Sequence, residues 1–229
     1  MGVRWSVSID WVVQMRKIPE NMTRTFVSIL MAGLVLVMTG CASSLTLETR
    51  LDVPVPLTTQ MPLTVAVYYP DEFSNYAYTE DTEDRPSWSI QCGTSQVDLF
   101  DRVLSSMFAN VVQVDGVSYQ GSQPPDIILV PEVEDMQFAL PQETRTDLYE
   151  AWIKYRILLY YPDGRRVGEW PIHGYGKTTT ELMKGRDEGL NMAINSAFRD
   201  IGAKFTIGFG RSDPFRQWQA DKQAGVVEP

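Results

Sequence analysis

The chain has 229 residues and a mass of 25.9 kDa, and its 20 Lys and Arg against 29 Asp and Glu give a net charge of −9 and a pI of about 4.7. This acidic balance argues against nucleic-acid binding, which needs a basic surface. Hydrophobic residues make up 44% of the sequence and charged residues 21%, so the chain can bury a core and is not intrinsically disordered. The length suits one domain with additional segments.

The N-terminal part of the chain has the layout of an export signal. An apolar stretch, residues 26–38, follows the basic residue Arg24. It is shorter than the roughly 20 residues that span a membrane, and small residues follow it, as in a secretory signal peptide. Residues 1–21 carry mixed charges, so we interpret them either as a stretch upstream of the true start at Met22 or as an extended n-region.

The end of this signal carries a more specific motif, Met38-Thr39-Gly40-Cys41. It resembles the lipobox of bacterial lipoproteins, in which the signal peptide, here residues 22–40, is removed and the cysteine is acylated. The resemblance implies a lipid on Cys41, and Ala42 in the next position implies sorting to the outer membrane, on its periplasmic face. Met38 stands where the family usually has leucine. The alternative interpretation of Cys41 is a small buried cysteine at the end of an apolar helix.

The mature chain would be more acidic than the whole. Residues 1–40 hold four of the basic and two of the acidic residues, so their removal leaves 16 against 27 and a net charge of −11. Residues 41–62 are rich in Pro, Ser and Thr, and we predict a lipidated tether that holds the domain off the membrane. The acidic stretch Asp71–Ser89 is predicted to be a solvated loop, since it lacks the spacing of an EF-hand calcium site.

A domain at residues 63–210 is predicted from periodicity. Apolar stripes at helical spacing predict two helices, and apolar or alternating runs predict strands. Pro131 indicates a bulge or irregular pairing, and Pro162-Asp163-Gly164 predicts a turn between two long strands. The polar tail, residues 211–229, is predicted either as a short helix or as disordered. The predicted strands are 64–69, 111–114, 127–138, 147–161 and 165–177, and the predicted helices are 93–108 and 187–205.

The order strand, helix, strand, strand, strand, helix predicts an α+β fold: a mainly antiparallel sheet of about four to five strands with two helices on one face. This order, the TVAVYYPD segment at 64–71, the turn at 162–164 and the closing helix resemble a loose group of periplasmic lipoprotein domains. The group includes auxiliary lipoproteins of ABC-type envelope transporters, the lipopolysaccharide-assembly lipoprotein and the N-terminal domain of TolB. The resemblance implies an envelope role and rests on pattern alone.

Residues of catalytic type do not form a recognisable motif. We find no nucleophile elbow, phosphate loop or zinc spacing, so the sequence predicts neither an enzyme nor a cofactor or metal site. His173 is expected to have no catalytic role, and Cys92 is expected to be buried or inert. The acidic residues Glu132, Glu134 and Asp135 are interpreted as a solvated face, with the first two on one side of a strand and the third on the other.

Two functions remain open from the sequence. The first is an outer-membrane lipoprotein that binds another, unidentified envelope protein as an assembly or transport accessory, without catalysis and without nucleic acid. Trp152 and Trp170 are predicted to lie near each other on the outer face of the hairpin, either as a partner surface or beneath the tether or tail. The alternative is a carrier that binds a lipid or glycan between sheet and helices through aromatic side chains, namely Tyr149, Tyr155, Tyr161 and Phe198.

Overall fold

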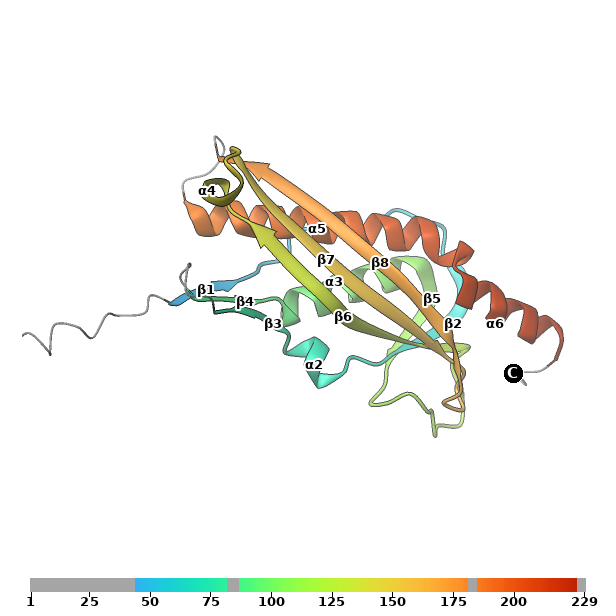
Figure 1. Cartoon of the computed structure of the whole chain (residues 1–229). Helices are drawn as coiled ribbons and strands as arrows, with labels where there is room; N and C mark the ends of the chain where they lie inside the picture. The colour runs from blue at the N-terminus through green and yellow to red at the C-terminus, as the bar shows by residue number, and fades with distance from the viewer. Residues whose placement is uncertain (1–43, 82–86, 181–184, 226–229) are drawn as a thin grey trace, which may run out of the picture. The chain divides into compact units, whose positions relative to one another are not determined.

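Two β-sheets and the helices packed on them make up the fold (Figure 1), described by a computed structural model for residues 44–81, 87–180 and 185–225. The larger sheet has five strands in the order β5-β2-β6-β7-β8 and the smaller has three in the order β1-β4-β3. The strands are β1 (Ser44–Glu48), β2 (Met61–Val67), β3 (Ala77–Glu80), β4 (Ser87–Gln91), β5 (Phe108–Gln113), β6 (Ile127–Ala139), β7 (Leu148–Tyr160) and β8 (Arg166–Thr179).

The fold is α+β as predicted, but the larger sheet is mixed rather than mainly antiparallel. β2 pairs in parallel with both β5 and β6, whereas β6, β7 and β8 pair antiparallel. The parallel pairs arise because long connections return the chain to the same end of the sheet before β5 and β6 begin. Helix α3 (Gly93–Met107) leads directly into β5, and the loop 114–126 joins β5 to β6.

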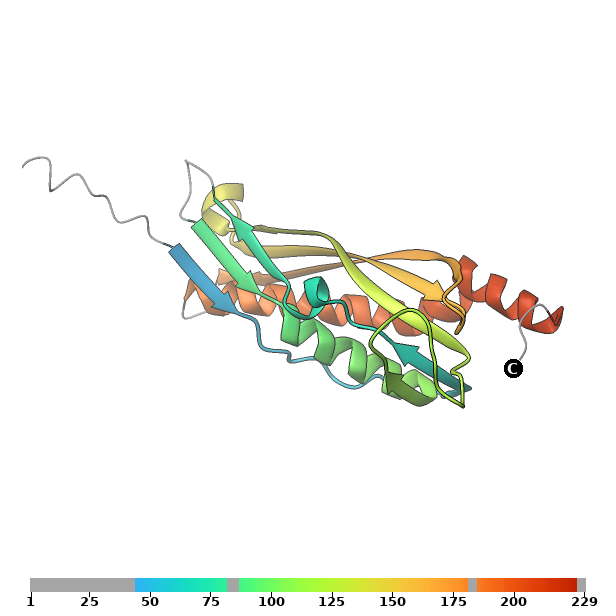
Figure 2. The ribbon, with the colours of Figure 1, turned by 90° about the horizontal axis from the view of Figure 1, so that it is seen from below.

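Both long helices cover one face of the five-stranded sheet, as predicted (Figure 2). They are α3 and α5 (Arg186–Gly208), and the predicted helix at 187–205 matches α5 closely. The apolar side chains of α5 recur every three or four residues, which puts them on one side of the helix, and all are buried. This buried stripe consists of Leu190, Ala193, Ile194, Ala197, Phe198, Ile201 and Phe205.

The interface between α5 and β8 depends on glycine. A Cβ added at Gly176 would overlap the backbone of Ala193 and Ala197, and one at Gly174 would overlap the carbonyl oxygen of Ala197. The absent side chains therefore let the helix backbone approach the strand directly. We call this side of the five-stranded sheet the helix-covered face.

Aromatic rings fill the helix-covered face between the sheet and the helices. Phe100 of α3 lies edge-on to Tyr155 of β7, with ring centroids 5.4 Å apart, and to Phe205 of α5 at 5.8 Å. The Tyr155 hydroxyl donates to the Gln96 side-chain oxygen at 2.9 Å, and the Gln96 amide donates to the Phe73 carbonyl. This buried polar chain is satisfied internally, as a buried polar group requires.

Residues 49–60, predicted as part of a tether, are fastened to the folded unit. The Asn195 side chain accepts from the Asp52 backbone N–H at 2.6 Å and donates to the Arg50 carbonyl at 2.7 Å, and Arg102 donates to the Val53 carbonyl at 2.9 Å. Val53 is buried. The folded unit therefore begins at Ser44, before the predicted boundary at residue 63, and we call residues 49–60 the strap.

The stretch predicted as a solvated loop, Asp71–Ser89, instead holds a short helix and two strands. Helix α2 (Asp71–Ser74) buries Phe73, and β3 and β4 form an antiparallel pair to which β1 adds in parallel. Trp88 and Ile90 alternate with serines along β4 and are buried. The acidic residues of this stretch obscured that short alternation.

The polar tail forms a helix beyond the predicted boundary at residue 210. A 3₁₀ turn (Phe209–Arg211) leads into α6 (Asp213–Gln223), and Phe215 and Trp218 of α6 are buried. The Trp218 indole N–H donates to the Asp126 carbonyl at 3.1 Å. These contacts confirm the helical alternative for residues 213–223. A short helix α4 (Pro141–Thr144) separates β6 from β7.

Candidate functional site

The opposite face of the five-stranded sheet is only partly covered. At one end the loop 114–126 packs over a small apolar cluster that includes Ile128, Val130 and Leu158. Elsewhere the outward side chains of β6, β7 and β8 reach solvent, and we call this region the open face. Because side chains alternate along a strand, the paired registers of the three strands define its members as Glu132, Glu134, Asp135, Gln137, Glu150, Trp152, Lys154, Arg156, Pro171, His173, Tyr175 and Lys177.

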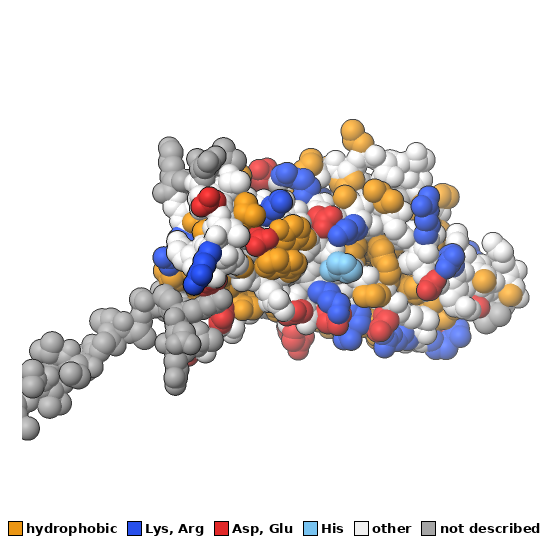
Figure 3. Space-filling view, turned by 45° about the horizontal axis from the view of Figure 1, so that its top comes forward, with side chains coloured by type: hydrophobic (Ala, Val, Ile, Leu, Met, Phe, Trp, Pro, Cys, Tyr) orange, Lys and Arg blue, Asp and Glu red, His pale blue; other side chains and the backbone are white. Residues whose placement is uncertain are grey.

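An aromatic pair occupies the open face. Trp152 of β7 lies directly opposite Tyr175 of β8, with ring centroids 5.3 Å apart and planes tilted by 35°. Trp152 is 40% exposed and Tyr175 37%, which is unusual for large aromatic side chains. In Figure 3, hydrophobic side chains gather on this side of the molecule with lysines, arginines and carboxylates around them.

Hydrogen bonds hold the tyrosine of this pair from both ends. Its hydroxyl donates to the Glu150 carboxylate, and its backbone N–H donates to Asp200 of α5 at 3.0 Å. The pKa of Tyr175 is raised to about 12. The hydrogen bond to Glu150 is the largest cause of this shift, and partial burial is the second. The phenol is therefore neutral at physiological pH, and its ring is fixed beside Trp152.

Side chains of the same helix, α5, form hydrogen bonds with backbone groups on the outer edge of β8. Lys204 of α5 donates to the His173 carbonyl at 2.9 Å and to Asp200 at 2.7 Å, while Asp200 accepts from the Tyr175 N–H. Two side chains of α5 thus satisfy backbone groups of an edge strand that would otherwise be available to pair with another chain. Binding at this site would use side chains of the face rather than the strand edge.

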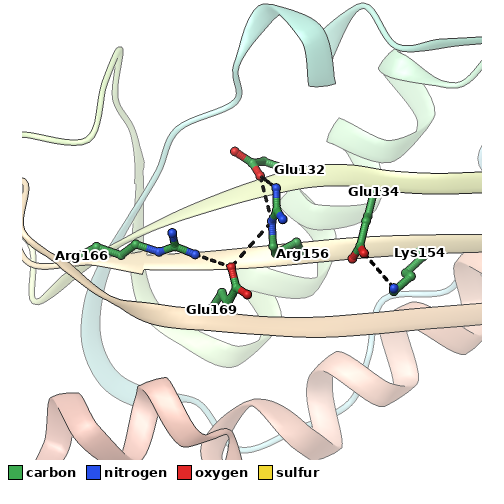
Figure 4. Close-up of polar contacts among 6 residues, drawn as sticks. All are labelled: Glu132, Glu134, Lys154, Arg156, Arg166 and Glu169. Carbon is green, nitrogen blue, oxygen red and sulfur yellow. Dashed lines mark hydrogen bonds and ion pairs between the residues drawn. The ribbon is translucent and has the colours of Figure 1, made fainter.

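Ion pairs form a ladder across β6, β7 and β8 (Figure 4). Arg156 donates to Glu132 at 2.8 Å and also approaches Glu169 at 3.8 Å, and Arg166 bonds Glu169 as well. Lys154 pairs with Glu134 at 2.8 Å. The hydrogen bond to Glu132 is the largest cause that raises the pKa of Arg156. All these side chains are about a third to a half exposed, so each pair contributes little to stability.

A β-bulge in β6 places the acidic residues Glu132, Glu134 and Asp135 differently from the prediction. The register shifts between Val133 and Asp135, so that Asp135 lies opposite Lys154 and shares the open face with Glu132 and Glu134. An extra residue in one strand reverses the side on which the following side chains lie. The prediction that Asp135 occupies the other side of the strand was therefore wrong.

A hollow of about 280 Å³ adjoins the aromatic pair. It is lined by Asp135, Gln137, Trp152, Ile153, Lys154, His173, Gly174 and Tyr175. The lining offers an apolar wall, a carboxylate, an amide and a cation, and it includes no serine, threonine or cysteine that could serve as a nucleophile. Within the described ranges no group of three or more His, Cys, Asp and Glu gathers to hold a metal. Its chemistry suits hydrogen bonding and stacking.

The two tryptophans predicted to share a face lie on opposite faces. Trp152 is on the open face, whereas Trp170 lies on the helix-covered face against Phe205, with ring centroids 5.5 Å apart, and against Phe209. The cause is a register shift in the hairpin between Leu159 and Tyr160. Without it, the pairing that begins at the turn would place Trp170 on the open face, because one residue of shift reverses every side chain.

The other residues singled out from sequence are placed as follows. Cys92 is buried, one of the two predicted alternatives, and burial raises the pKa of its thiol to about 12. His173 is exposed on the open face. Cys41 lies outside the described residues. Sequence reasoning missed Tyr175, whose position opposite Trp152 follows only once the shift in the hairpin is known.

The aromatic residues proposed for a carrier serve in packing. Tyr155 and Phe198 are completely buried, and Tyr149 and Tyr161 are nearly so. Tyr149 lies against Gly189 of α5, and the Tyr161 hydroxyl donates to Asp221 of α6. These four side chains therefore join the sheet to the helices at the places where a carrier would need space.

Comparison with known proteins gives distant structural likenesses. No family model and no curated protein matches the sequence. A protein of the family DUF330 from Xanthomonas campestris is 15% identical, with 78% of this chain and 99% of that chain covered and a TM-score of 0.48. A neuraminyllactose-binding hemagglutinin homologue from Helicobacter pylori is 11% identical, with 77% and 100% covered and a TM-score of 0.45.

A minor lipoprotein from Acinetobacter baumannii is 10% identical, with 67% of this chain and 94% of that chain covered and a TM-score of 0.35. At such identities and scores the likenesses assign neither a family nor a function to this chain. Within the described ranges, none of the helices has the length and apolar character needed to cross a bilayer.

Proposed function

We propose that the protein is an outer-membrane lipoprotein that acts without catalysis, as an accessory subunit that binds another envelope protein. In this proposal the lipid is attached to Cys41, and the partner binds the open face. The observation that carries it is the Trp152–Tyr175 pair, two large rings held in place yet more than a third exposed. Such anchors, surrounded by polar groups, are typical of the centre of a protein interface.

The surroundings of the pair favour a protein as the partner. Lys154 and Lys177 lie near Asp135 and Glu150 on the open face, so both signs of charge are available within a short distance. A surface of mixed charge favours one arrangement of a complementary protein surface and discriminates against wrong partners. The partner would lie flat on the face, because the hollow beside Trp152 holds only about 280 Å³.

Photo-cross-linking in cells tests the binding face. A benzoylphenylalanine at Lys177, which is exposed on the open face, should give one dominant adduct with an envelope protein, and the matched position Gln219 on α6 should not. Trp152→Ala should lower the adduct at least tenfold, since removing an interface anchor costs about 2 kcal/mol or more. Equal adducts from both positions, or an adduct unaffected by Trp152→Ala, would contradict the proposal.

Fractionation tests the anchor. Cys41→Ser should leave the domain folded but remove it from the outer-membrane fraction, because acyl chains contribute roughly 0.8 kcal/mol for each buried CH₂. Circular dichroism of the variant provides the folding control. Retention of Cys41→Ser in that fraction would refute the lipid anchor while leaving the binding face to be judged by cross-linking.

A further inference from the structure

The connection between the proposed lipid site and the folded unit is very short. Strand β1 begins at Ser44, so only residues 42 and 43 separate it from Cys41. Three peptide units span at most about 11 Å when fully extended. The tether predicted over residues 41–62 would have reached several times farther.

The beginning of the folded unit is firmly paired. Ser44 of β1 lies opposite Ser87 of β4, and Leu47 is buried in the core. Beyond β1, Thr49 donates to the Gln91 carbonyl through its backbone N–H at 3.1 Å and its hydroxyl at 2.7 Å. The strap that follows is held by α3 and α5. Lengthening the connection would therefore require breaking strand pairs of a sheet and the partly buried hydrogen bonds that hold the strap.

The start of β1 lies at one end of an elongated domain. Trp88 of β4 packs edge-to-face against Phe138 of β6, with ring centroids 5.2 Å apart. This contact places the end of β6, and α4 that follows it, at the same end of the domain as β1. Figures 1 and 2 agree that β1, α4 and the first turn of α5 lie together, with α6 at the opposite end. We call these the near end and the far end.

The far end lies beyond the reach of the connection. The 23 residues of α5 run along the domain and span about 34 Å at 1.5 Å per residue, and α6 continues past them. We infer that the domain stands end-on on the membrane, with its near end at the lipid headgroups and α6 directed away. This inference rests on the proposed lipid anchor.

Charge does not set this orientation. Described side chains near α4, the start of β4 and the first turn of α5 include Asp81, Glu143, Asp147, Asp187 and Glu188 against Arg145 and Arg186, so these described side chains have no excess of positive charge for binding anionic lipid. The acidic chain is repelled by an anionic surface over about one Debye length, roughly 8–10 Å. The covalent connection, rather than charge, would therefore hold the near end within that distance, since the far end carries Arg211, Arg216 and Lys222 against Asp213 and Asp221.

Fluorescence quenching tests the orientation in the full-length lipidated protein. A fluorophore is attached to Gln142→Cys in α4 or to Gln219→Cys in α6, both exposed positions, while Cys92 is buried. In phosphatidylethanolamine and phosphatidylglycerol vesicles that contain a nitroxide-headgroup lipid, the label on α4 should be quenched several-fold more than the label on α6. Equal quenching, or stronger quenching of α6, would overturn the inference.

A longer connection provides the matched control. Twelve Gly and Ser residues inserted after Ala42 have an r.m.s. span of roughly 20 Å, and they should reduce quenching at position 142 toward that at position 219 without changing flotation with the vesicles. Unchanged quenching would mean that the near end binds headgroups by itself and would overturn the role of the connection. If the unmodified protein fails to float, the lipid anchor fails; if it floats with equal quenching, only the orientation fails.

Discussion

The two faces of the five-stranded sheet use similar aromatic residues in opposite ways. On the helix-covered face, Tyr155 and Trp170 pack against rings of α3 and α5, and glycines let α5 approach β8. On the open face, Trp152 and Tyr175 stack on each other, and charged side chains rather than a second layer surround them. The difference separates side chains that stabilise the fold from side chains that are free to contact a partner, as proposed above: changes on the first face should unfold the domain, and changes on the second should leave it folded.

The largest expected effect is on the helix-covered face. Gly176→Ala adds a Cβ that would overlap the backbone of α5, which cannot yield as a flexible side chain can. We expect a loss of about 3 kcal/mol in the free energy of unfolding, or failure to fold. Urea denaturation followed by circular dichroism measures it, and Gly210→Ala, with open space around the added Cβ, should stay within about 0.5 kcal/mol.

The same substitution on both faces makes a direct comparison. Tyr155→Phe leaves the buried Gln96 side-chain oxygen without its donor, so we expect a loss of about 1–3 kcal/mol. Tyr175→Phe removes only an exposed bond to Glu150 and should change stability by less than about 0.5 kcal/mol. Equal losses for the two variants, measured in urea, would refute the division between the faces.

The pH dependence of the free energy of unfolding tests whether the Cys92 thiol is buried in the core on the helix-covered side. Burial raises the pKa of the Cys92 thiol to about 12 from an ordinary 9.0, so above pH 9 the unfolded chain releases a proton that the folded protein retains. This contribution is intact below pH 9 and is lost as the pH rises toward 12. From pH 8 to 10 the wild type should lose about 1.4 kcal/mol more than Cys92→Ala. Equal losses of unfolding free energy in the wild type and in Cys92→Ala would show that the thiol is not buried.

A small effect is also expected from the ion pairs of the open face. Lys154→Met breaks the pair with Glu134, both of them partly exposed, and should change the free energy of unfolding by less than about 1 kcal/mol. The change should shrink further in 1 M salt, because salt screens exposed charges. A loss above 2 kcal/mol that persists in salt would mean that this ladder supports the fold.

Sequence periodicity predicted the long helices and strands. It failed where the position of a residue depends on strand register or on contacts with residues distant in the sequence. The alternation of β7 and the apolar stripe of α5 identified both elements closely, since each buries one side along its whole length. The face of Trp170 depends on a one-residue shift in the hairpin that periodicity does not reveal. The open face could be predicted only as one side of a hairpin, because its aromatic pair joins residues across two strands.

The N-terminal segments were missed for a different reason. In β1 only two leucines alternate with polar residues, a signal too short to identify a strand. The strap has no periodicity, and its partners lie far along the chain: Asn195, which fixes Asp52, is 143 residues away. Local sequence rules cannot find contacts that close only when the last long helix is in place.

The strap also constrains the order of folding. Its clamp on Asn195 and Arg199 cannot form until α5 has been made and has packed, and β1 needs β4 as its partner. Contacts of such high sequence separation form late, because closing a long loop costs entropy before any contact compensates for it. Under the proposed function, in which the chain is exported, the N-terminal segment would therefore emerge first and be among the last parts to fold. An enzyme that acylates Cys41, as proposed, would therefore act before β1 and the strap have packed on the rest of the domain.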